Sequence, residues 1–275
     1  MNPMDEKLKT LKQILSDMKS ALLAFSGGVD STFLLSVAKE VLGDKILAVT
    51  AKADIFPSYE IQEAKGIACS IGVNHIFIET GQLQNSEFIK NPTNRCYICK
   101  KILLSHLIKI AKENNLNYVL DGSNSDDLND YRPGTKAVVE LGIRSPLQEA
   151  RFTKAEIRMS SQKMGLKTWD KPPLACLATR IPYGEKITKE KLRRIDQAEI
   201  FLLQLGIKGV RVRDHNNIAR IEVTKEELPR LLELNCADKI VAYLKSLGYT
   251  YVTVDLEGYR TGSLNEMVEV KNGQK

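Results

Sequence analysis

The stretch that most constrains the fold of this chain is a glycine-rich sequence at residues 26–31, which reads Ser-Gly-Gly-Val-Asp-Ser. An apolar run of strand length at 21–25 precedes it, and apolar side chains recur at helical spacing over 32–42 after it. The pattern therefore predicts a strand, a tight turn and a helix. Two adjacent glycines allow positive φ angles and let an anion approach without a Cβ in the way.

Such a turn is typical of a phosphate site, because the first amides and the dipole of the helix favour a phosphate or pyrophosphate. Ser26 and Ser31 add hydroxyl donors, and Asp30 is a candidate ligand for a Mg²⁺ ion that bridges phosphate oxygens. The Walker signature ends in Gly-Lys-Ser/Thr, but no lysine follows these glycines, which disfavours γ-phosphate transfer. The pattern instead resembles the PP-loop of the ATP pyrophosphatases, which adenylylate a substrate and release pyrophosphate. An ordinary glycine-rich turn is the alternative interpretation.

The bulk properties indicate a globular protein of one large or two medium domains, with 275 residues and a formal charge of +6. The lysines are scattered, so the charge alone does not require an RNA partner. No apolar run approaches the roughly 20 residues of a membrane span. Residues 1–19 are interpreted as an amphipathic helix without the apolar core of a signal peptide, which predicts a cytoplasmic protein.

Strands and helices are expected to alternate through the first two thirds of the chain, which predicts βαβ units and a parallel sheet. Ligands of such sheets bind at the carboxyl ends of the strands. After the first strand and helix, strands are predicted at 45–51, 74–79 and 117–121 with a short fifth at 145–147, and helices at 59–71 and 101–114.

A turn-rich stretch at 181–185 is interpreted as a domain junction, so the predicted domains are 1–180 and 181–275. The polar segment at 123–134 suits a substrate or nucleotide loop, in which Arg132 is the candidate for a phosphate contact; a solvated connection is the alternative. The second domain is expected to be a small α+β module. Its predicted elements are helices at 188–205 and 228–247, a strand pair within 210–223 and a last strand at 250–256.

Two arginines of that module, Arg211 and Arg213, alternate along a predicted strand and therefore share one face. Guanidinium groups that project together repel unless an anion or acidic residues lie between them. They are thus a candidate phosphate fork. A solvated strand face with a salt bridge to Glu222 explains the pattern equally well.

Five cysteines without a secretory signal indicate reduced thiols, and hence metal binding or catalysis. Cys96 and Cys99 form a Cys-x-x-Cys pair, and Cys176 follows a Pro-Pro loop. Such a pair is compatible with redox chemistry, half a zinc site or two iron ligands. Three cysteines can hold three irons of a 4Fe-4S cluster and leave the fourth open; unrelated thiols are the alternative. Cys69 and Cys236 are interpreted as small buried apolar residues.

Together these motifs resemble the LarE family over nearly the whole chain. The resemblance implies an α/β fold, with a Rossmann-like parallel sheet of the PP-loop ATP pyrophosphatase type followed by a small α+β domain. LarE proteins are ATP-dependent sulfur transferases that build the nickel-pincer nucleotide of lactate racemase. They adenylylate a carboxylate of pyridinium-3,5-biscarboxylic acid mononucleotide and replace its oxygen by sulfur. The matching segments are 26–31, 129–134, 147–150, 176–184, 210–213, 218–222 and 258–262.

The resemblance also implies cofactors, partners and site residues. In one form of the family the cysteine at the position of Cys176 gives up its own sulfur. Because Cys96 and Cys99 are present here, the chain is more similar to members in which three cysteines ligate a 4Fe-4S cluster that carries an extra sulfide. ATP, Mg²⁺, a sulfide donor and a homo-oligomer are implied as well. The implied ATP-binding residues are Ala24, Ser26, Gly27, Gly28, Asp30, Ser31, Ala51, Gly122, Arg132 and Gln148; the phosphate of the substrate would bind Arg211, Arg213 and Arg260; and Cys176, Asp30, Glu199 and Glu222 would be catalytic.

Three other functions remain open from the sequence. A cluster-dependent tRNA thiolase would also use a PP-loop and three cysteines, but the chain has neither zinc-ribbon pairs nor a concentrated basic stretch. An amide-forming enzyme such as an NAD synthetase would have no use for the cysteines. A nucleotide-binding regulatory protein would bind ATP without chemistry.

Overall fold

The computed structural model describes residues 3–128, 133–173 and 175–260. Its contacts divide the chain into two compact units. The first comprises residues 1–53, 59–82 and 94–174, and the second comprises 54–58, 83–93 and 175–275. The domain boundary expected after residue 180 stays a prediction.

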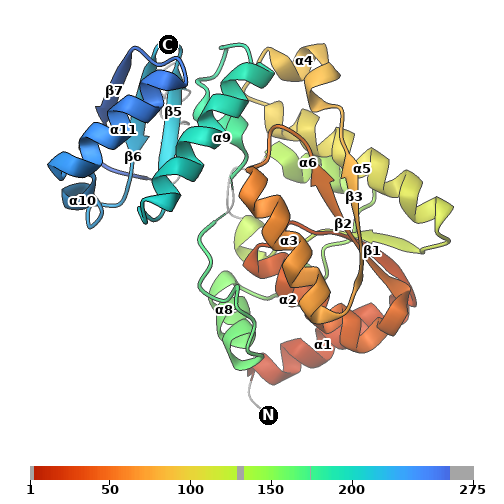
Figure 1. Ribbon diagram of the computed structural model, residues 1–275. Coiled ribbons are helices and arrows are strands. Elements are labelled where there is room, and N and C mark those ends of the chain that lie inside the picture. The colour runs from red at the N-terminus through yellow and green to blue at the C-terminus, as the bar shows by residue number, and fades with distance from the viewer. Residues whose placement is uncertain (1–2, 129–132, 174, 261–275) are drawn as a thin grey trace, which may run out of the picture. The chain divides into compact units, whose positions relative to one another are not determined.

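The first unit is built on a four-stranded parallel sheet in the order β3-β2-β1-β4 (Figure 1). This confirms the predicted α/β fold with a parallel, Rossmann-like sheet. The strands are β1 (Ala21–Ala24), β2 (Ile46–Lys52), β3 (Asn74–Glu79) and β4 (Tyr118–Leu120).

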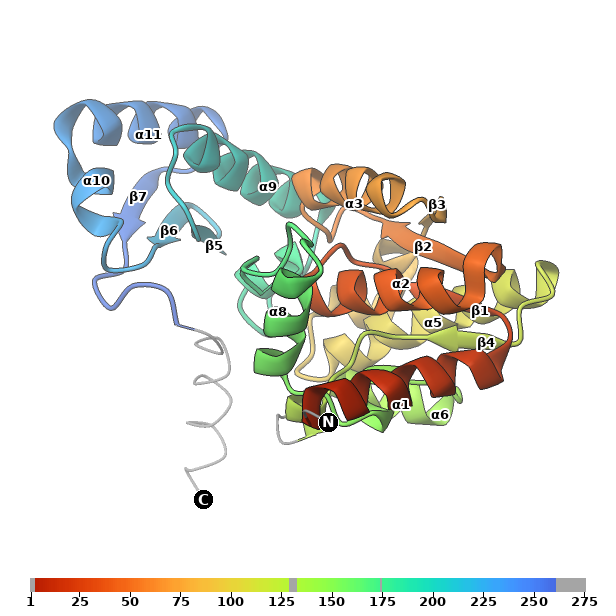
Figure 2. The same cartoon turned by 90° about the horizontal axis from the view of Figure 1, so that it is seen from below.

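Side chains of β1 alternate between two separate cores, as the two-residue period of a strand requires. Ala21 and Leu23 pack in a core with the helices α1 and α2, whereas Leu22 packs in another core with α5. Figure 2 shows α1, α2 and α5 packed against this sheet. Because both faces are covered, the strand is apolar throughout and shows no polar face.

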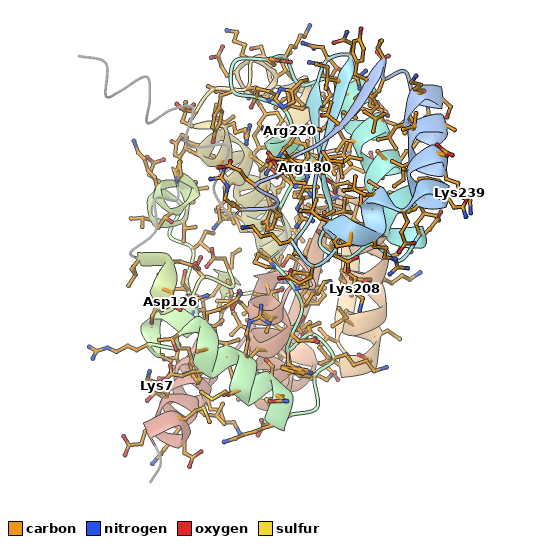
Figure 3. The ribbon with its side chains drawn as sticks, turned by 90° about the vertical axis from the view of Figure 1, so that its left-hand side faces the viewer. Lys7, Asp126, Arg180, Lys208, Arg220 and Lys239 are labelled. Atoms are coloured by element: carbon orange, nitrogen blue, oxygen red, sulfur yellow. The ribbon has the colours of Figure 1, made fainter. Side chains whose placement is uncertain are left out.

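Helices connect these strands and extend the unit beyond them. The helix α8 begins with a capping box, in which Thr153 and Glu156 satisfy each other's backbone amides. Figure 3 shows Lys7 of α1 beside α8, and the Nζ of Lys7 donates to Glu156 at 2.7 Å. The helices are α1 (Pro3–Met18), α2 (Val29–Leu42), α3 (Ser58–Ile71), α5 (Arg95–Glu113), α6 (Pro133–Glu140), α7 (Pro146–Glu149) and α8 (Lys154–Lys163).

The predicted fifth strand at 145–147 is wrong. Only Arg144 bridges to the sheet, through the carbonyl of Val119 and the amide of Asp121. The next residue but one, Pro146, has no N–H to donate to a strand, and its fixed φ suits the first turn of a helix. The chain therefore turns into α7 directly after one bridge.

The second unit has a three-stranded sheet in the order β5-β6-β7, with β5 and β6 antiparallel and β6 and β7 parallel. The long helix predicted at 188–205 is confirmed, but the one predicted at 228–247 is two helices, because Glu233 between them has a non-helical ψ of 132°. The elements are α4 (Ser86–Ile89), α9 (Lys189–Gln204), β5 (Arg211–His215), β6 (Ile218–Glu222), α10 (Leu228–Leu232), α11 (Leu234–Ser246) and β7 (Tyr251–Val254).

No helix in the described ranges is both long enough and apolar enough to cross a membrane.

Candidate functional site

The PP-loop joins β1 to α2 with a tight approach to a neighbouring helix. Gly27 has a φ of +71°, and a Cβ added there would lie 3.2 Å from the Cα of Ala64. Gly28 occupies the N-cap of α2, so that position supplies no side chain to accept from the first amides of the helix. Ala24 ends β1 and Ala51 lies next to the end of β2, so both flank the loop's edge of the sheet.

Two serine hydroxyls fix the turn from inside. The Oγ atoms of Ser26 and Ser31 are 3.1 Å apart, and the Oγ of Ser31 donates to the carbonyl of Gly28 at 3.2 Å. A Cβ added to Gly122, just after β4, would lie 3.2 Å from the amide nitrogen of Ser31. The backbone of the neighbouring strand end thus approaches the start of α2 closely.

Two lysines from distant parts of the first unit reach this loop. The Nζ of Lys154, at the start of α8, lies 2.5 Å from Oδ2 of Asp30, while the side-chain amide of Asn124 donates to the other oxygen at 3.3 Å. The Nζ of Lys171 donates to the carbonyl oxygen of Gly27 at 3.2 Å. The loop therefore has cations beside it although its own sequence lacks the Walker lysine.

Neither lysine was predicted from the sequence, because lysines are common on protein surfaces and neither of these two follows a glycine-rich turn. One local signal existed for Lys154. It lies directly after Thr153 in the pattern Thr-x-x-Glu, which marks the start of a helix. The position of Lys154 at the start of a helix was therefore predictable from the sequence. Its contact with Asp30, 124 residues away, was not.

A buried carboxylate links the end of β4 to the start of α5. Asp121 accepts from the Nζ of Lys100 at 2.8 Å, and from the hydroxyls of Ser145 at 2.7 Å and Ser123 at 2.8 Å. Burial alone would raise the pKa of Asp121, but the charge of Lys100 and these hydrogen bonds together lower it. Because Lys100 directly follows Cys99, this contact brings the Cys-x-x-Cys turn to the same strand end as the PP-loop.

Cys96 and Cys99 are the second and fifth residues of α5, three residues apart and hence on one face, and both are half-buried. The side-chain amide of Gln82 donates to the Sγ of Cys99 at 3.8 Å. Cys176 belongs to the second unit and is also half-buried. Within the described residues, no three His, Cys, Asp or Glu side chains form a metal-binding group, so the cluster stays a prediction. Cys69, expected to be buried, is exposed on α3.

Glu199 and Arg180 form a buried ion pair in the second unit, and each is 1% exposed. Both carboxylate oxygens of Glu199 accept from the guanidinium at 2.9 Å, and one also accepts from the amide of Val212. The guanidinium, which Figure 3 labels, also donates to the carbonyls of Ala175 and Cys176. The pair thus fastens the Cys176 loop to α9 and β5, and the catalytic role of Glu199 stays a prediction.

The predicted arginine face is buried. Arg213 donates to Glu222 at 2.7 Å and to the carbonyl of Thr179 at 2.7 Å, and Arg220 on the neighbouring strand donates to the same carboxylate at 3.1 Å. Arg211 lies on the same face and is also buried. The ion pair expected by the alternative interpretation is therefore present, but the strand face is not solvated. The phosphate role of the two arginines and the catalytic role of Glu222 stay predictions.

Three further predicted residues differ in their surroundings. The side-chain amide of Gln148 donates to the carbonyl of Asn124 at 3.2 Å. The side chain of Asn124 in turn donates to the carboxylate of Asp30, so Gln148 is linked to the PP-loop through Asn124. Arg260 is exposed and pairs with Glu257 at 2.6 Å. Arg132 lies outside the described residues.

A parallel sheet whose first strand runs through Ser-Gly-Gly-Val-Asp-Ser into a helix, with cations at the turn, defines a PP-loop ATP-using enzyme. In agreement, the asparagine synthase family matches residues 11–155. A pyridinium-3,5-bisthiocarboxylic acid mononucleotide synthase of Lactiplantibacillus plantarum is 40% identical over 94% of each chain. An uncharacterized protein of Synechocystis is 44% identical over 96% of this chain and 99% of its own. The chain belongs to the LarE family of ATP-dependent sulfur transferases, as its motifs predicted.

A more distant similarity supports the assignment of the nucleotide-binding unit. A glutamine-hydrolyzing GMP synthase of Aeropyrum pernix is 25% identical over 70% of this chain, which is 41% of the synthase.

Proposed function

We propose that this enzyme adenylylates a carboxylate of pyridinium-3,5-biscarboxylic acid mononucleotide and converts it to a thiocarboxylate. A carboxylate oxygen attacks the α-phosphorus of ATP and pyrophosphate leaves; sulfide sulfur then attacks the acyl carbon and AMP leaves. The 40% identical relative from Lactiplantibacillus plantarum is a pyridinium-3,5-bisthiocarboxylic acid mononucleotide synthase, which supports this choice of acceptor.

One observation carries the proposal. The PP-loop and the Cys-x-x-Cys turn lie at the same edge of one sheet, joined by the contact between Lys100 and Asp121. An amide-forming enzyme or a regulatory nucleotide-binding protein would need the ATP loop but not the thiols. A tRNA thiolase would need both the ATP loop and the thiols, and it differs from the proposed enzyme in its acceptor, which is a tRNA base.

The chain's own residues fit a magnesium–pyrophosphate complex at the PP-loop. Mg²⁺ prefers one or two carboxylates together with phosphate oxygens, and the carboxylate of Asp30 is partly exposed beside the loop. A Mg²⁺ ion on Asp30 would leave the Nζ of Lys154 for a phosphate oxygen, where its charge would stabilise the departing pyrophosphate.

The three cysteines fit a 4Fe-4S cluster by the chemistry of their donors. Cys96 lies in the first turn of α5, where the dipole favours a thiolate, and Cys99 follows one turn later. Cys176 directly precedes a short 3₁₀ turn, Leu177–Arg180, in the second unit. Such a cluster would leave one iron open to an added sulfide, and would so supply sulfur without consuming a cysteine. We further propose a homo-oligomer, which light scattering of the purified protein would test.

The adenylylation step is tested by Asp30→Asn, which removes the charge that the metal needs but keeps the shape of the side chain. We expect loss of pyrophosphate release from ATP in the presence of the acceptor, with an unchanged circular dichroism spectrum. Asp44→Asn is the matched control, because Asp44 is an exposed carboxylate paired with Lys39 away from the loop. Release at the parental rate by Asp30→Asn would remove the PP-loop from the mechanism.

The sulfur source is tested by anaerobic purification with iron and acid-labile sulfide analysis. Cys99→Ala should lose iron and sulfur transfer while adenylylation survives, and Cys69→Ala, on an exposed position of α3, should change neither. Mass spectrometry after turnover gives the opposing test. Intact Cys176 is expected, and its conversion to dehydroalanine in proportion to product would establish sacrificial transfer instead.

A further inference from the structure

A buried amide next to the cysteine pair has no function in the account above. Gln82 lies in a 3₁₀ turn (Gln82–Gln84) shortly after β3, and it is 0% exposed. Its Nε2 donates to the Sγ of Cys99 at 3.8 Å, a distance within the range of hydrogen bonds to sulfur. Its carbonyl oxygen accepts no hydrogen bond from any described residue.

Such a side chain is expensive to bury. A buried amide oxygen without a partner costs on the order of 1–3 kcal/mol, and a methionine of similar length would fill the same space without that cost. Packing therefore does not account for glutamine here. The one polar contact of its side chain among the described residues is the sulfur of Cys99.

The identity of the sulfur decides how the amide must face. Either end of an amide can face a thiol, because a thiol both donates and accepts weakly. A metal-bound thiolate only accepts, so it holds the N–H end of the amide toward itself. Hydrogen bonds to cluster sulfurs stabilise the more negative, reduced state and therefore raise the reduction potential.

We propose that Gln82 is a positioning residue of the iron–sulfur site, donating an N–H···S hydrogen bond to the Cys99 thiolate and raising the reduction potential of the cluster. The inference rests on the cluster of the proposed function. It also explains why Cys99 is approached by a polar side chain from the end of β3, on the same edge of the sheet as the PP-loop.

The test uses the full chain, reconstituted anaerobically with iron and sulfide, and measures the midpoint potential of the cluster. Gln82→Met keeps the volume and removes the donor. We expect parental iron content and a midpoint that is lower by about 59 mV, which is a tenfold change in the reduced-to-oxidised ratio for one electron. Gln84→Met, in the same turn but exposed, is the matched control and should keep the parental potential.

Each outcome separates the two proposals. If the parental chain binds no iron, the cluster of the proposed function is wrong and this inference falls with it. If the parental chain holds a cluster and Gln82→Met has the same potential, the role of Gln82 is overturned while the cluster stands. Should Gln82→Met fail to fold, Gln82→Leu supplies a second side chain without a hydrogen-bond donor, and a parental potential in that variant overturns the inference equally.

Discussion

The buried ion pair between Glu199 and Arg180 predicts that the sequence-derived catalytic role of Glu199 is secondary to a structural one. Glu199→Gln keeps the shape of the side chain but leaves a 1% exposed guanidinium without its counter-charge. Removing one partner of a buried pair costs about 3–5 kcal/mol. The free energy of unfolding falls by roughly 1–3 kcal/mol for each 1 M of urea, so the urea midpoint of the second unit should fall by about 1 M or more.

The assay must follow the second unit alone. The single tryptophan, Trp169, belongs to the first unit, so its fluorescence does not report the change directly. Hydrogen exchange of the peptide that covers β5 and β6 does, because the amide of Val212 donates to the carboxylate of Glu199 at 2.9 Å. Faster exchange of this amide is expected in the variant. Glu87→Gln is the control, because Glu87 forms an exposed pair with Lys90 that should be worth little.

A double variant strengthens the design. Replacing both partners of a buried pair by apolar residues is often close to neutral, so Arg180→Met with Glu199→Leu should recover part of the lost stability. The reasoning is refuted if Glu199→Gln keeps the parental urea midpoint and exchange rate but loses turnover. The carboxylate would then act in the reaction, as the family resemblance implies.

Three other changes test the remaining contacts. Lys154→Met should raise the KM for ATP about tenfold or more, because a charge-assisted phosphate contact contributes roughly 1.5–3 kcal/mol, and steady-state pyrophosphate release measures it. Arg213→Lys keeps a charge toward Glu222 but loses the planar fork, so the KM for the pyridinium acceptor should rise while that for ATP stays parental; equal effects on both would return Arg213 to a structural role. Asp121 has a lowered pKa, so its stabilising contribution is present above about pH 4 and is lost as the pH falls through the folded value. In Lys100→Met burial remains without its compensating charge, so acid unfolding followed by tryptophan fluorescence should begin at a higher pH; an unchanged acid midpoint would contradict the pairing.

The parts of the fold that the sequence predicted are those governed by local pattern. The strand, glycine turn and helix around residues 21–42 follow from periodicity and from glycine's freedom at positive φ, and the structure has them. The errors occur where the backbone at a single residue determines where a strand or helix ends. Pro146 ends a strand after one bridge, and Glu233 divides a helix whose apolar spacing continues across it. Cys69 satisfied the helical spacing of buried residues but is exposed on α3.

The candidate site divides in the same way. Glycines and hydroxyls of the PP-loop are adjacent in sequence, so their meeting was predictable. Lys154 and Lys171 contact the same loop from 124 and 144 residues away, and no local sequence pattern predicts either contact. Gln82 is similar, since 17 residues separate it from the sulfur it contacts.

The two lysines change what the missing Walker lysine means. A lysine within the turn itself moves with the backbone that binds the phosphates, and it stays on the β and γ phosphates throughout. Lys154 instead extends from another helix and pairs with Asp30, the carboxylate that we propose as the Mg²⁺ ligand. Under that proposal, a metal on Asp30 would leave the Nζ of Lys154 for a phosphate oxygen. A lysine held in this way would contact the phosphates only in the complex with metal and nucleotide, which would suit displacement at the α-phosphorus followed by release of pyrophosphate.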